Sequence, residues 1–153
     1  MQELDNKDKQ LLGLLQKNGR EQLKILARQI GLSIDSTKKR IEKLKKAGII
    51  AKFGAFIDPK AVGYDLVANV QIKLHNISEE ELAKFIAYLK AHKSVTTLIT
   101  TLGDFDITCV LIAKNTDEMD SLFREIRHKF KNIIADWKSV INLKLHKFEE
   151  YSF

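Results

Sequence analysis

The stretch that decides the fold is LARQIGLS, residues 26–33. Its small residue Ala27 lets two helices approach closely, and Gly31 allows the chain to turn within a few residues. Leu32 then fills the gap beneath the turn, and Ser33 offers an amino-terminal cap for the next helix. This combination predicts a helix-turn-helix, whose second helix can lie in the major groove of DNA while the first crosses the backbone.

Further helix signals place this motif in a three-helix unit. Asp5 with Asp8 forms a capping box at the start of a first helix, which ends at Asn18-Gly19. Apolar residues recur at helical spacing through all three segments. The expected helices span about residues 5–18, 21–31 and 33–48. We therefore expect a helix-turn-helix domain over residues 1–50.

The net charge of the chain is concentrated in that domain. The 153 residues include 26 basic and 20 acidic side chains, a formal net charge of +6. Residues 1–50 hold 12 of the basic and 6 of the acidic side chains, so the remainder, with 14 of each, is neutral. A basic module joined to a neutral one is typical of nucleic-acid-binding proteins.

The third helix carries six of these basic residues. Alone, such a run would be explained as a solvated face, but its place after the helix-turn-helix favours DNA, where lysines attract phosphates. Arg40 is open to two interpretations, because it could reach a phosphate or brace the domain from inside. The residues expected to bind DNA are Ser33, Ile34, Asp35, Ser36, Lys38, Lys39, Arg40 and Lys43. Base reading is expected at the amino-terminal end of the helix, from Ile34, Asp35, Ser36, Lys38 and Lys39.

A connecting segment, residues 51–64, follows the basic domain. Residues 49–57, IIAKFGAFI, alternate loosely and predict a connecting strand, and Asp58-Pro59 marks a turn after it. Two arrangements are open for this strand. It could pair with its copy in a second subunit, or it could form the edge of an ordinary hairpin.

Residues 65–153 show signals in the order strand-helix-strand-strand-helix-strand. Capping boxes begin the two helices at Ser78 and Asn115, and Gly103-Asp104 is a tight hairpin turn. The pattern predicts an α+β chain that ends in a ferredoxin-like βαββαβ domain, with both helices on one face of an antiparallel sheet. The other face, if apolar, would be buried by another subunit. The expected strands span about residues 66–74, 95–102, 105–113 and 133–148.

The composition argues against several classes of protein. No apolar run reaches the roughly 18 residues of a membrane span, and the amino terminus shows no apolar signal region, so we expect a cytoplasmic protein. Cys109 is the only cysteine, so no internal disulfide can form. The histidines lack metal-ligand spacing, and no phosphate-binding glycine loop or nucleophile motif occurs. We expect no metal, no catalytic residues and no cofactor apart from a possible effector.

Six stretches match the pattern of a known family. They are Leu4-Asp5-x-x-Asp8, Asn18-Gly19-Arg20, Leu26-Ala27-x-x-x-Gly31-Leu32-Ser33, Arg40-Ile41-x-x-Leu44, Gly48-Ile49-Ile50 and Gly103-Asp104-Phe105-Asp106. On these residues the chain resembles the Lrp/AsnC, or feast/famine, transcription factors over nearly its whole length. The resemblance implies dimers held by the sheet faces, assembled further into tetramers or octamers. It also implies that an amino acid or similar effector binds between subunits.

The resemblance places the effector site at the hairpin, on Gly103, Asp104 and Asp106. The residue types are consistent with this role, since glycine allows close backbone approach and a carboxylate can bind an α-ammonium group. Without the resemblance, the same residues would be interpreted as a turn and a surface carboxylate. The predicted protein is a sequence-specific transcriptional regulator of double-stranded DNA that responds to an amino acid or related effector. The alternatives are a stand-alone small-molecule-binding module or an RNA-binding protein.

Overall fold

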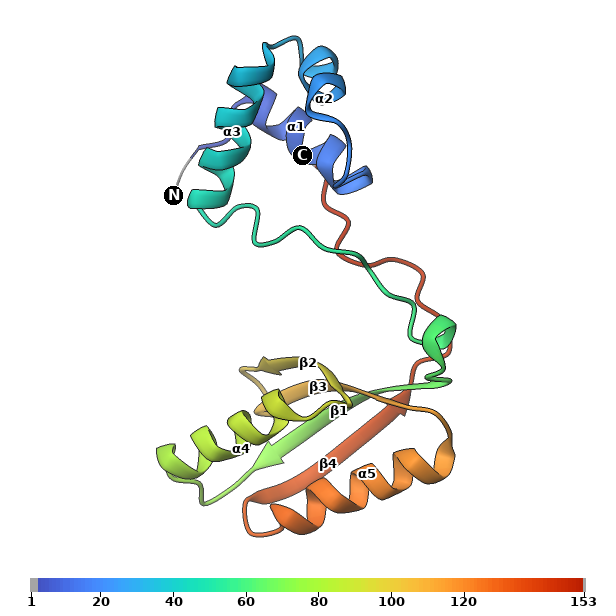
Figure 1. Cartoon of the computed structure of the whole chain (residues 1–153). Coiled ribbons are helices and arrows are strands. Elements are labelled where there is room, and N and C mark those ends of the chain that lie inside the picture. Colours follow the sequence, from blue (N-terminus) through green and yellow to red (C-terminus); the bar gives the residue numbers. More distant parts are fainter. Residues whose placement is uncertain (1–2, 153) are drawn as a thin grey trace. The chain divides into compact units, whose positions relative to one another are not determined.

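In the computed structural model, which describes residues 3–152, the chain forms two compact units. The first, here the head unit, is Met1–Phe56 with His146–Phe153, and the second, here the sheet unit, is Ile57–Leu145. Figure 1 labels the helices and strands of each unit. The polypeptide passes between the units twice, once after Phe56 and once before His146.

The head unit contains three helices: α1 (Asn6–Lys17), α2 (Leu23–Ile30) and α3 (Ile34–Lys46). Their shared core has five buried apolar residues, Leu11, Leu12, Leu26, Ile30 and Leu44. The expected capping box begins α1, because the Asp5 carboxylate accepts a hydrogen bond from the Asp8 amide at 2.8 Å. The three predicted helices are therefore confirmed, although α2 begins slightly later than expected.

The join between α2 and α3 forms as the motif predicts. Gly31 ends α2 in the left-handed conformation, with φ +66°, and the Leu32 amide donates a hydrogen bond to the Ala27 carbonyl at 2.9 Å. Ala27 is buried, as expected for the small residue of this motif. The Ser33 hydroxyl then accepts from the Ser36 amide at 3.1 Å and caps α3.

The connecting strand expected over residues 49–57 is not formed. Residues 51–58 have no regular secondary structure, and a short 3-10 helix, η1 (Lys60–Val62), follows them. A strand needs a neighbour to take its main-chain hydrogen bonds, and no strand within residues 3–152 pairs with this segment. The expectation of a hairpin edge was therefore wrong, while pairing with a second copy stays a prediction.

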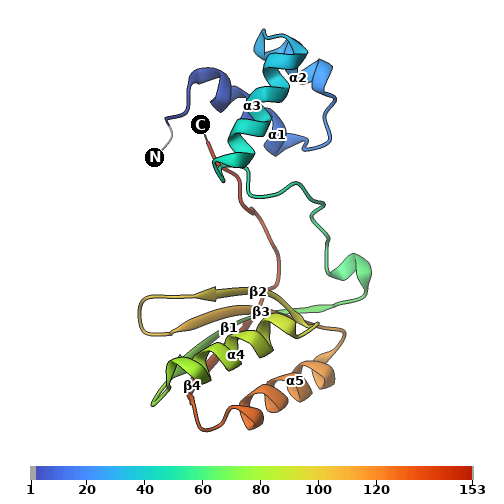
Figure 2. The ribbon, with the colours of Figure 1, turned by 60° about the vertical axis from the view of Figure 1, so that its left-hand side comes forward.

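The sheet unit has the predicted ferredoxin-like order of elements. They are β1 (Leu66–Leu74), α4 (Glu79–Ala91), β2 (Val95–Thr100), β3 (Ile107–Ala113), α5 (Thr116–Lys129) and β4 (Ile134–Ile141). The strands lie in the order β2-β3-β1-β4, and every neighbouring pair is antiparallel. Figure 2 shows α4 and α5 together on one side of this sheet.

The core of the sheet unit lies between the sheet and these two helices. Alternate residues of β1, from Ala68 to Leu74, are buried there with Phe85 of α4 and Ile126 of α5. The opposite face of the sheet is mixed, since Val67 of β1 and Val110 of β3 point to it, as does Gln71 of β1. The helix-covered face therefore holds the core of the sheet unit.

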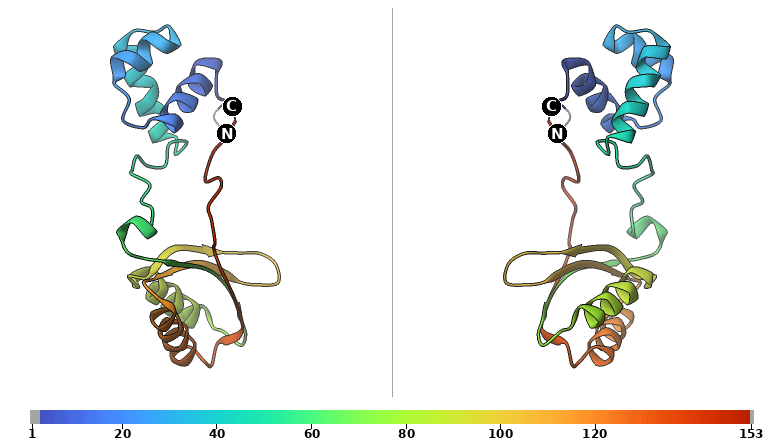
Figure 3. Two further views of the ribbon diagram at one scale, coloured as in Figure 1. Left: turned by 90° about the vertical axis from the view of Figure 1, so that its right-hand side faces the viewer. Right: turned by 90° about the vertical axis from the view of Figure 1, so that its left-hand side faces the viewer.

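The strands are shorter than predicted at two places. β4 ends at Ile141 instead of continuing to residue 148, because β1 begins at Leu66 and the Asn142 amide makes the final bond, to the Val67 carbonyl at 2.7 Å. β2 ends at Thr100 and β3 begins at Ile107, so a loop replaces the expected two-residue turn. Figure 3 shows this loop projecting from the sheet. The capping box at Ser78 is complete, whereas at Asn115 only the asparagine half is present, since Glu118 accepts instead from the Lys114 amide.

Candidate functional site

The exposed face of α3 carries the predicted DNA-binding residues. Two α3 side chains, Thr37 and Leu44, are buried and fix which face of the helix points inward. Seven of the eight predicted residues are exposed: Ser33, Ile34, Asp35, Ser36, Lys38, Lys39 and Lys43. The helix therefore exposes basic groups along its length, and its amino-terminal end exposes polar residues together with the apolar Ile34.

The carboxyl-terminal half of α3 forms a basic depression. Lys39, Lys43 and Lys46 line it together with Glu42 and Ala47. The spacing of these lysines, four and three residues apart, puts them on one side of the helix. Three ammonium groups against one carboxylate leave this surface positive, which suits a phosphate backbone. The depression continues the face that carries Lys39 toward the end of the helix.

Arg40 is the predicted residue that does not join the exposed face. Its guanidinium Nη1 lies 2.7 Å from Asp5 Oδ2 and 2.7 Å from Asp8 Oδ1, and Asp8 is buried. These carboxylates raise the pKa of Arg40, while the pKa of Asp5 is lowered, first by the Asp8 amide and then by Arg40. Of the two interpretations left open by the sequence, Arg40 adopts the internal brace.

Lys7 is a basic residue that sequence reasoning missed, and it lies near the turn between α2 and α3. The Lys7 ammonium of α1 donates to the carbonyl of Ile30, the last residue of α2, at 2.5 Å. The contact spans 23 residues, so no local pattern could reveal it. Lys7 and Ile30 only meet because α1 packs across the helix-turn-helix.

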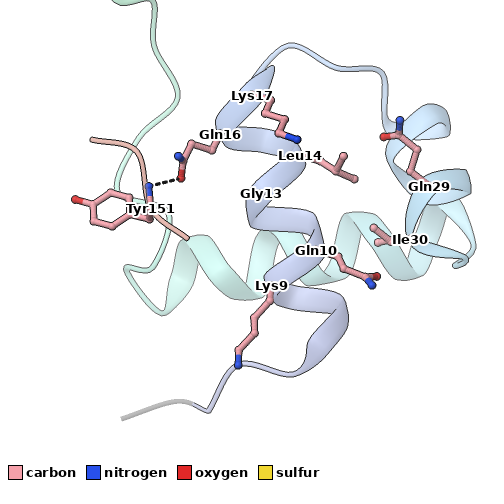
Figure 4. A pocket seen from close by; sticks show the side chains of 9 residues that line it. All are labelled: Lys9, Gln10, Gly13, Leu14, Gln16, Lys17, Gln29, Ile30 and Tyr151. Carbon is pink, nitrogen blue, oxygen red and sulfur yellow. Dashed lines mark hydrogen bonds between the residues drawn. The ribbon is translucent and has the colours of Figure 1, made fainter. Parts of the chain in front are cut away.

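The tail, residues 146–152, contacts the three-helix head. The Tyr151 amide donates to Gln16 Oε1 of α1 at 3.2 Å, and the Phe148 ring lies 5.0 Å from the Phe56 ring. Figure 4 shows Tyr151 beside α1, at a pocket lined by Lys9, Gln10, Gly13, Leu14, Gln16, Lys17, Gln29 and Ile30. The predicted carboxyl-terminal domain, residues 65–153, includes this tail, because no local pattern reveals a contact between residues 135 apart in sequence.

The predicted effector residues lie in and beside the loop between β2 and β3. The loop is closed by the Thr101 amide, which donates to the Asp106 carbonyl at 2.8 Å, and by the Thr101 hydroxyl, which donates to the Phe105 carbonyl. Gly103 has φ +154° and Asp104 is exposed beside it. Gly103 and Asp104 therefore lie together at the tip of the loop.

Asp106 lies apart from the loop tip and anchors the base of the loop. One of its carboxylate oxygens, Oδ2, accepts from the Leu74 amide at 2.7 Å, at the irregularity between Lys73 and Leu74 where β1 loses its register with β4. The Asp106 amide donates to the Ile72 carbonyl at 3.0 Å. Asp106 thus continues the hydrogen bonding of β1 past Ile107, the first residue of β3. One carboxylate oxygen is committed to this main-chain contact.

The described residues offer little for metal or thiol chemistry. Within residues 3–152 no group of three or more histidine, cysteine or acidic side chains could hold a metal ion. Burial raises the pKa of the Cys109 thiol to about 12, so it stays protonated at neutral pH and is a poor nucleophile. None of the helices within residues 3–152 is long and apolar enough to cross a membrane.

The basic three-helix head and the ferredoxin-like sheet unit define a class of protein: a helix-turn-helix DNA-binding protein with an attached ligand-binding domain. Residues 4–45 match the family of AsnC-type helix-turn-helix domains, and residues 67–149 match the Lrp/AsnC ligand binding domain. The chain belongs to the Lrp/AsnC family of transcriptional regulators. Its helix-turn-helix is the DNA-binding domain of that family, and its second domain is the ligand binding domain of that family.

Relatives and solved structures agree with this assignment. The HTH-type transcriptional regulator FL11 of Pyrococcus horikoshii is 31% identical over 144 residues, which cover 94% of this chain and 92% of the relative. The structure of E. coli AsnC aligns with a TM-score of 0.82 at 27% identity, covering 99% of each chain. A transcriptional regulator of Neisseria meningitidis in complex with L-Met has the same fold, with a TM-score of 0.84 at 22% identity over 95% of this chain and 94% of the other.

Proposed function

We propose that α3 is the recognition helix and that it contacts double-stranded DNA through its exposed face. The observation that carries this proposal is the exposure of Lys38, Lys39 and Lys43 on a helix whose inward face is fixed by Thr37 and Leu44. The amino-terminal residues Ile34, Asp35 and Ser36, with Lys38 and Lys39, read base edges, and the later lysines contact phosphates. The protein acts where it meets DNA, in the cytoplasm.

A gel-shift titration over salt concentration tests the DNA contact. Basic residues that displace counterions from phosphates give a log–log plot of affinity against salt with a steep negative slope. We expect that slope on duplex DNA. A flat slope, or tighter binding to single-stranded RNA of the same length, would contradict the proposal.

Substitutions on α3 test the residues. Lys38→Ala and Lys39→Ala should each weaken binding to the operator by about 1–3 kcal/mol if the side chain makes a base contact. Lys90→Ala is the matched control, because Lys90 is an exposed lysine on α4 of the sheet unit. Equal affinities for the α3 variants and the control would remove these lysines from the site.

We further propose that the effector is an amino acid bound near the β2–β3 loop. The support is chemical, since Asp104 is exposed and Asp106 keeps one carboxylate oxygen outside the bond to Leu74. A carboxylate pairs with an α-ammonium group, and Gly103 leaves room for a ligand near the backbone. The name of the Neisseria complex, in which a protein of the same fold holds L-Met, is a further reason to begin with amino acids.

Thermal-shift screening of the twenty amino acids tests this site. A ligand that binds the folded protein raises its melting temperature. In Asp106→Asn the side-chain oxygen can still accept from the Leu74 amide, so the melting temperature without ligand should stay near that of the wild type while the ligand-induced rise is lost. Asp65→Asn, just before the opposite end of β1, should keep the full rise. A rise retained in Asp106→Asn would exclude this carboxylate.

The working form is proposed to be a homodimer or a larger closed assembly. Apolar side chains such as Ile99, Val110 and Val140 occur on the sheet face that α4 and α5 leave uncovered, and Ile99 and Val140 are exposed. A second copy would cover them and would also give residues 49–57 a strand to pair with. Light scattering coupled to chromatography should give a mass of at least twice 17.5 kDa. A single-chain mass at micromolar concentration would contradict this.

A further inference from the structure

The first turn of α1 contacts both helices of the helix-turn-helix. Lys7 donates from its ammonium group to the Ile30 carbonyl at the end of α2. Asp5 and Asp8 accept from the Arg40 guanidinium of α3 at 2.7 Å each. Three residues of α1 and its cap therefore reach across to two other helices, over sequence separations of 23 to 35 residues.

The Lys7 contact is placed at the turn itself. The final carbonyls of a helix have no intrahelical donor, and a cation at that end is favoured by the helix dipole. A Cβ added to Gly31, the residue that turns the chain, would lie 3.6 Å from the Lys7 Nζ atom. Lys7 thus fixes the end of α2 at the residue where the direction of the chain changes.

The Arg40 contact differs from an ordinary surface ion pair. Asp8 is only 2% exposed as a residue, so the Arg40 charge meets a carboxylate that water hardly reaches. Both carboxylates are also held by the capping box, in which the Asp8 amide donates to Asp5 and the Asp5 amide donates to Asp8. Each acid therefore has a fixed position before Arg40 arrives, which reduces the entropy lost when the pair forms.

A phosphate contact that draws Arg40 Nη1 away from these carboxylates would break this arrangement. Turning the guanidinium toward DNA would leave Asp8 buried without its cation, and a buried unpaired charge is strongly destabilising. The exposed lysines of α3 have no such commitment to α1 and are free to meet phosphates. Chemistry therefore separates the roles of neighbouring basic residues on one helix.

We propose that Asp5, Lys7 and Asp8 form a clamp that sets the placement of α3 relative to α2, and that Arg40 is a positioning residue rather than a phosphate contact. The inference rests on the proposed role of α3 as the recognition helix. A recognition helix reads bases only if the preceding helix crosses the backbone at a matching angle. The clamp fixes that relation from a third helix that does not itself need to touch DNA.

Neutralising an acid of the clamp distinguishes two possible roles of that acid, because each role predicts a change of DNA affinity in the opposite direction. Removing a negative charge from a DNA-binding domain strengthens its general attraction to phosphates. If Asp5 only restrains Arg40 from reaching DNA, Asp5→Asn should bind DNA more tightly. If Asp5 positions α3, the same change should weaken binding to a preferred sequence. Asp5 is the milder choice, because its side chain is 53% exposed whereas that of Asp8 is buried.

The experiment compares two duplexes bound by the full-length protein. One is selected from a random pool by the wild type, and the other is the unselected pool. Asp5→Asn and Arg40→Met should lose about tenfold or more on the selected duplex, the size of one misaligned base contact. On the unselected pool, Asp5→Asn should bind as well as the wild type or better. The salt slope of Arg40→Met should equal that of the wild type.

Substitutions at Glu3 and Lys7 serve as controls for loss of charge and for the loss of the contact with Ile30. Glu3→Gln removes the same charge from the same end of the chain and should keep the affinity for the selected duplex. Lys7→Met should lose that affinity and Lys7→Arg should restore much of it, since arginine can still donate to the Ile30 carbonyl. A salt slope that is shallower by about one in Arg40→Met, with equal losses on both duplexes, would make Arg40 a phosphate contact and overturn the clamp.

The same measurements distinguish failure of the clamp from failure of DNA binding itself. If the wild type shows no steep salt dependence on either duplex, the proposed role of α3 fails. If the wild type binds normally and Asp5→Asn keeps full affinity for the selected duplex, the clamp alone fails. Far-UV circular dichroism at the binding temperature shows whether each variant retains its helices. Asp5→Asn decides between the two roles if Arg40→Met does not fold.

Discussion

The head unit and the sheet unit are held together by different kinds of contact. Within the described residues, the buried apolar cluster of the head has five members, while that of the sheet unit has fourteen. The long-range ion pairs show the opposite distribution. Asp5 and Asp8 join Arg40 across more than thirty residues of sequence in the head. In the sheet unit the pairs Lys84–Glu80 and Arg124–Asp120 lie one helical turn apart on the surface. Its one long-range pair within residues 3–152, His92–Glu125 at 3.9 Å, is an ion pair only when the histidine is protonated.

The difference indicates where each unit can be damaged. Surface pairs one turn apart contribute little to stability, so the sheet unit depends on the packing of its large core. The head has a small core, and a small core contributes little to the free energy of unfolding. Caps, turns and buried ion pairs must therefore contribute a larger share in the head. Substitutions of polar side chains or of turn glycines should therefore change the stability of the head more than that of the sheet unit. Substitutions that leave a cavity should cause the largest loss of stability in the sheet unit.

The largest effect is expected from Phe85→Ala. Phe85 is fully buried, with its ring 4.6 Å from the Phe130 ring, and removing such a ring costs about 3–5 kcal/mol. Trp137 on β4 is the single tryptophan of the chain, so its fluorescence during urea unfolding reports on the sheet unit. Phe56→Ala, at a largely exposed ring of the head, should leave that transition unchanged. A similar shift in both variants would show that the units do not unfold separately.

The next effect is expected from Leu44→Ala in the head. Leu44 is fully buried in the five-residue cluster, and its truncation should cost about 2–5 kcal/mol. DNA binding should be lost at moderate temperature, while the urea midpoint seen by Trp137 stays where it was. A shift of the tryptophan signal comparable to that of Phe85→Ala would contradict the separation of the two cores.

A pair of glycine substitutions in the head should have opposite signs. Gly31→Ala should destabilise the head by about 1–2 kcal/mol, because a Cβ is strained at φ +66°. Gly13→Ala, within α1, has no atom within 4 Å of the new Cβ and should stabilise it by about 0.5–1 kcal/mol. The helical circular-dichroism signal, followed during heating, measures both. Equal signs would show that backbone conformation does not limit the stability of the head.

The smallest effects are expected from pH, and they should separate the units. Burial, and next the hydrogen bond to Glu125, raise the pKa of Tyr88 to about 12 from an ordinary value of 10.0. Above about pH 10 the unfolded chain releases this proton while the folded sheet unit keeps it, so stability falls as pH rises toward 12. Cys109 acts in the same direction. Tyr88→Phe should reduce the alkaline loss seen by Trp137, and an identical loss would exclude Tyr88.

Acid should weaken the head through Asp5. Its pKa is lowered below 3.8 by the Asp8 amide and by Arg40, so it contributes stability above that pH, which is lost as the pH falls through its folded pKa. The helical signal should therefore fall in acid more steeply in the wild type than in Asp5→Asn. Parallel acid curves would show that other carboxylates dominate.

Much of the fold could be predicted because its signals are local. The caps at Asp5, Ser33 and Ser78 and the turn at Gly31 depend on residues within one helical turn, and all are present. Strand ends could not be predicted, because they depend on partners: β4 ends where β1 no longer faces it. The same limit applies to the site. The exposure of α3 follows from its periodicity, whereas the contacts of Arg40 and Asp106 join residues 32 or more apart.

The return of the tail to the head has a consequence for the order in which the protein is made. The ribosome completes α1, α2 and α3 first, but Phe148 and Tyr151 reach the head only after the whole sheet unit has been synthesised. A nascent chain can therefore display a helix-turn-helix that still lacks its aromatic contacts with residues 146–152. Completion of the head therefore waits for the synthesis of residues 146–152, so chains released before β4 and the tail are made carry an unfinished head.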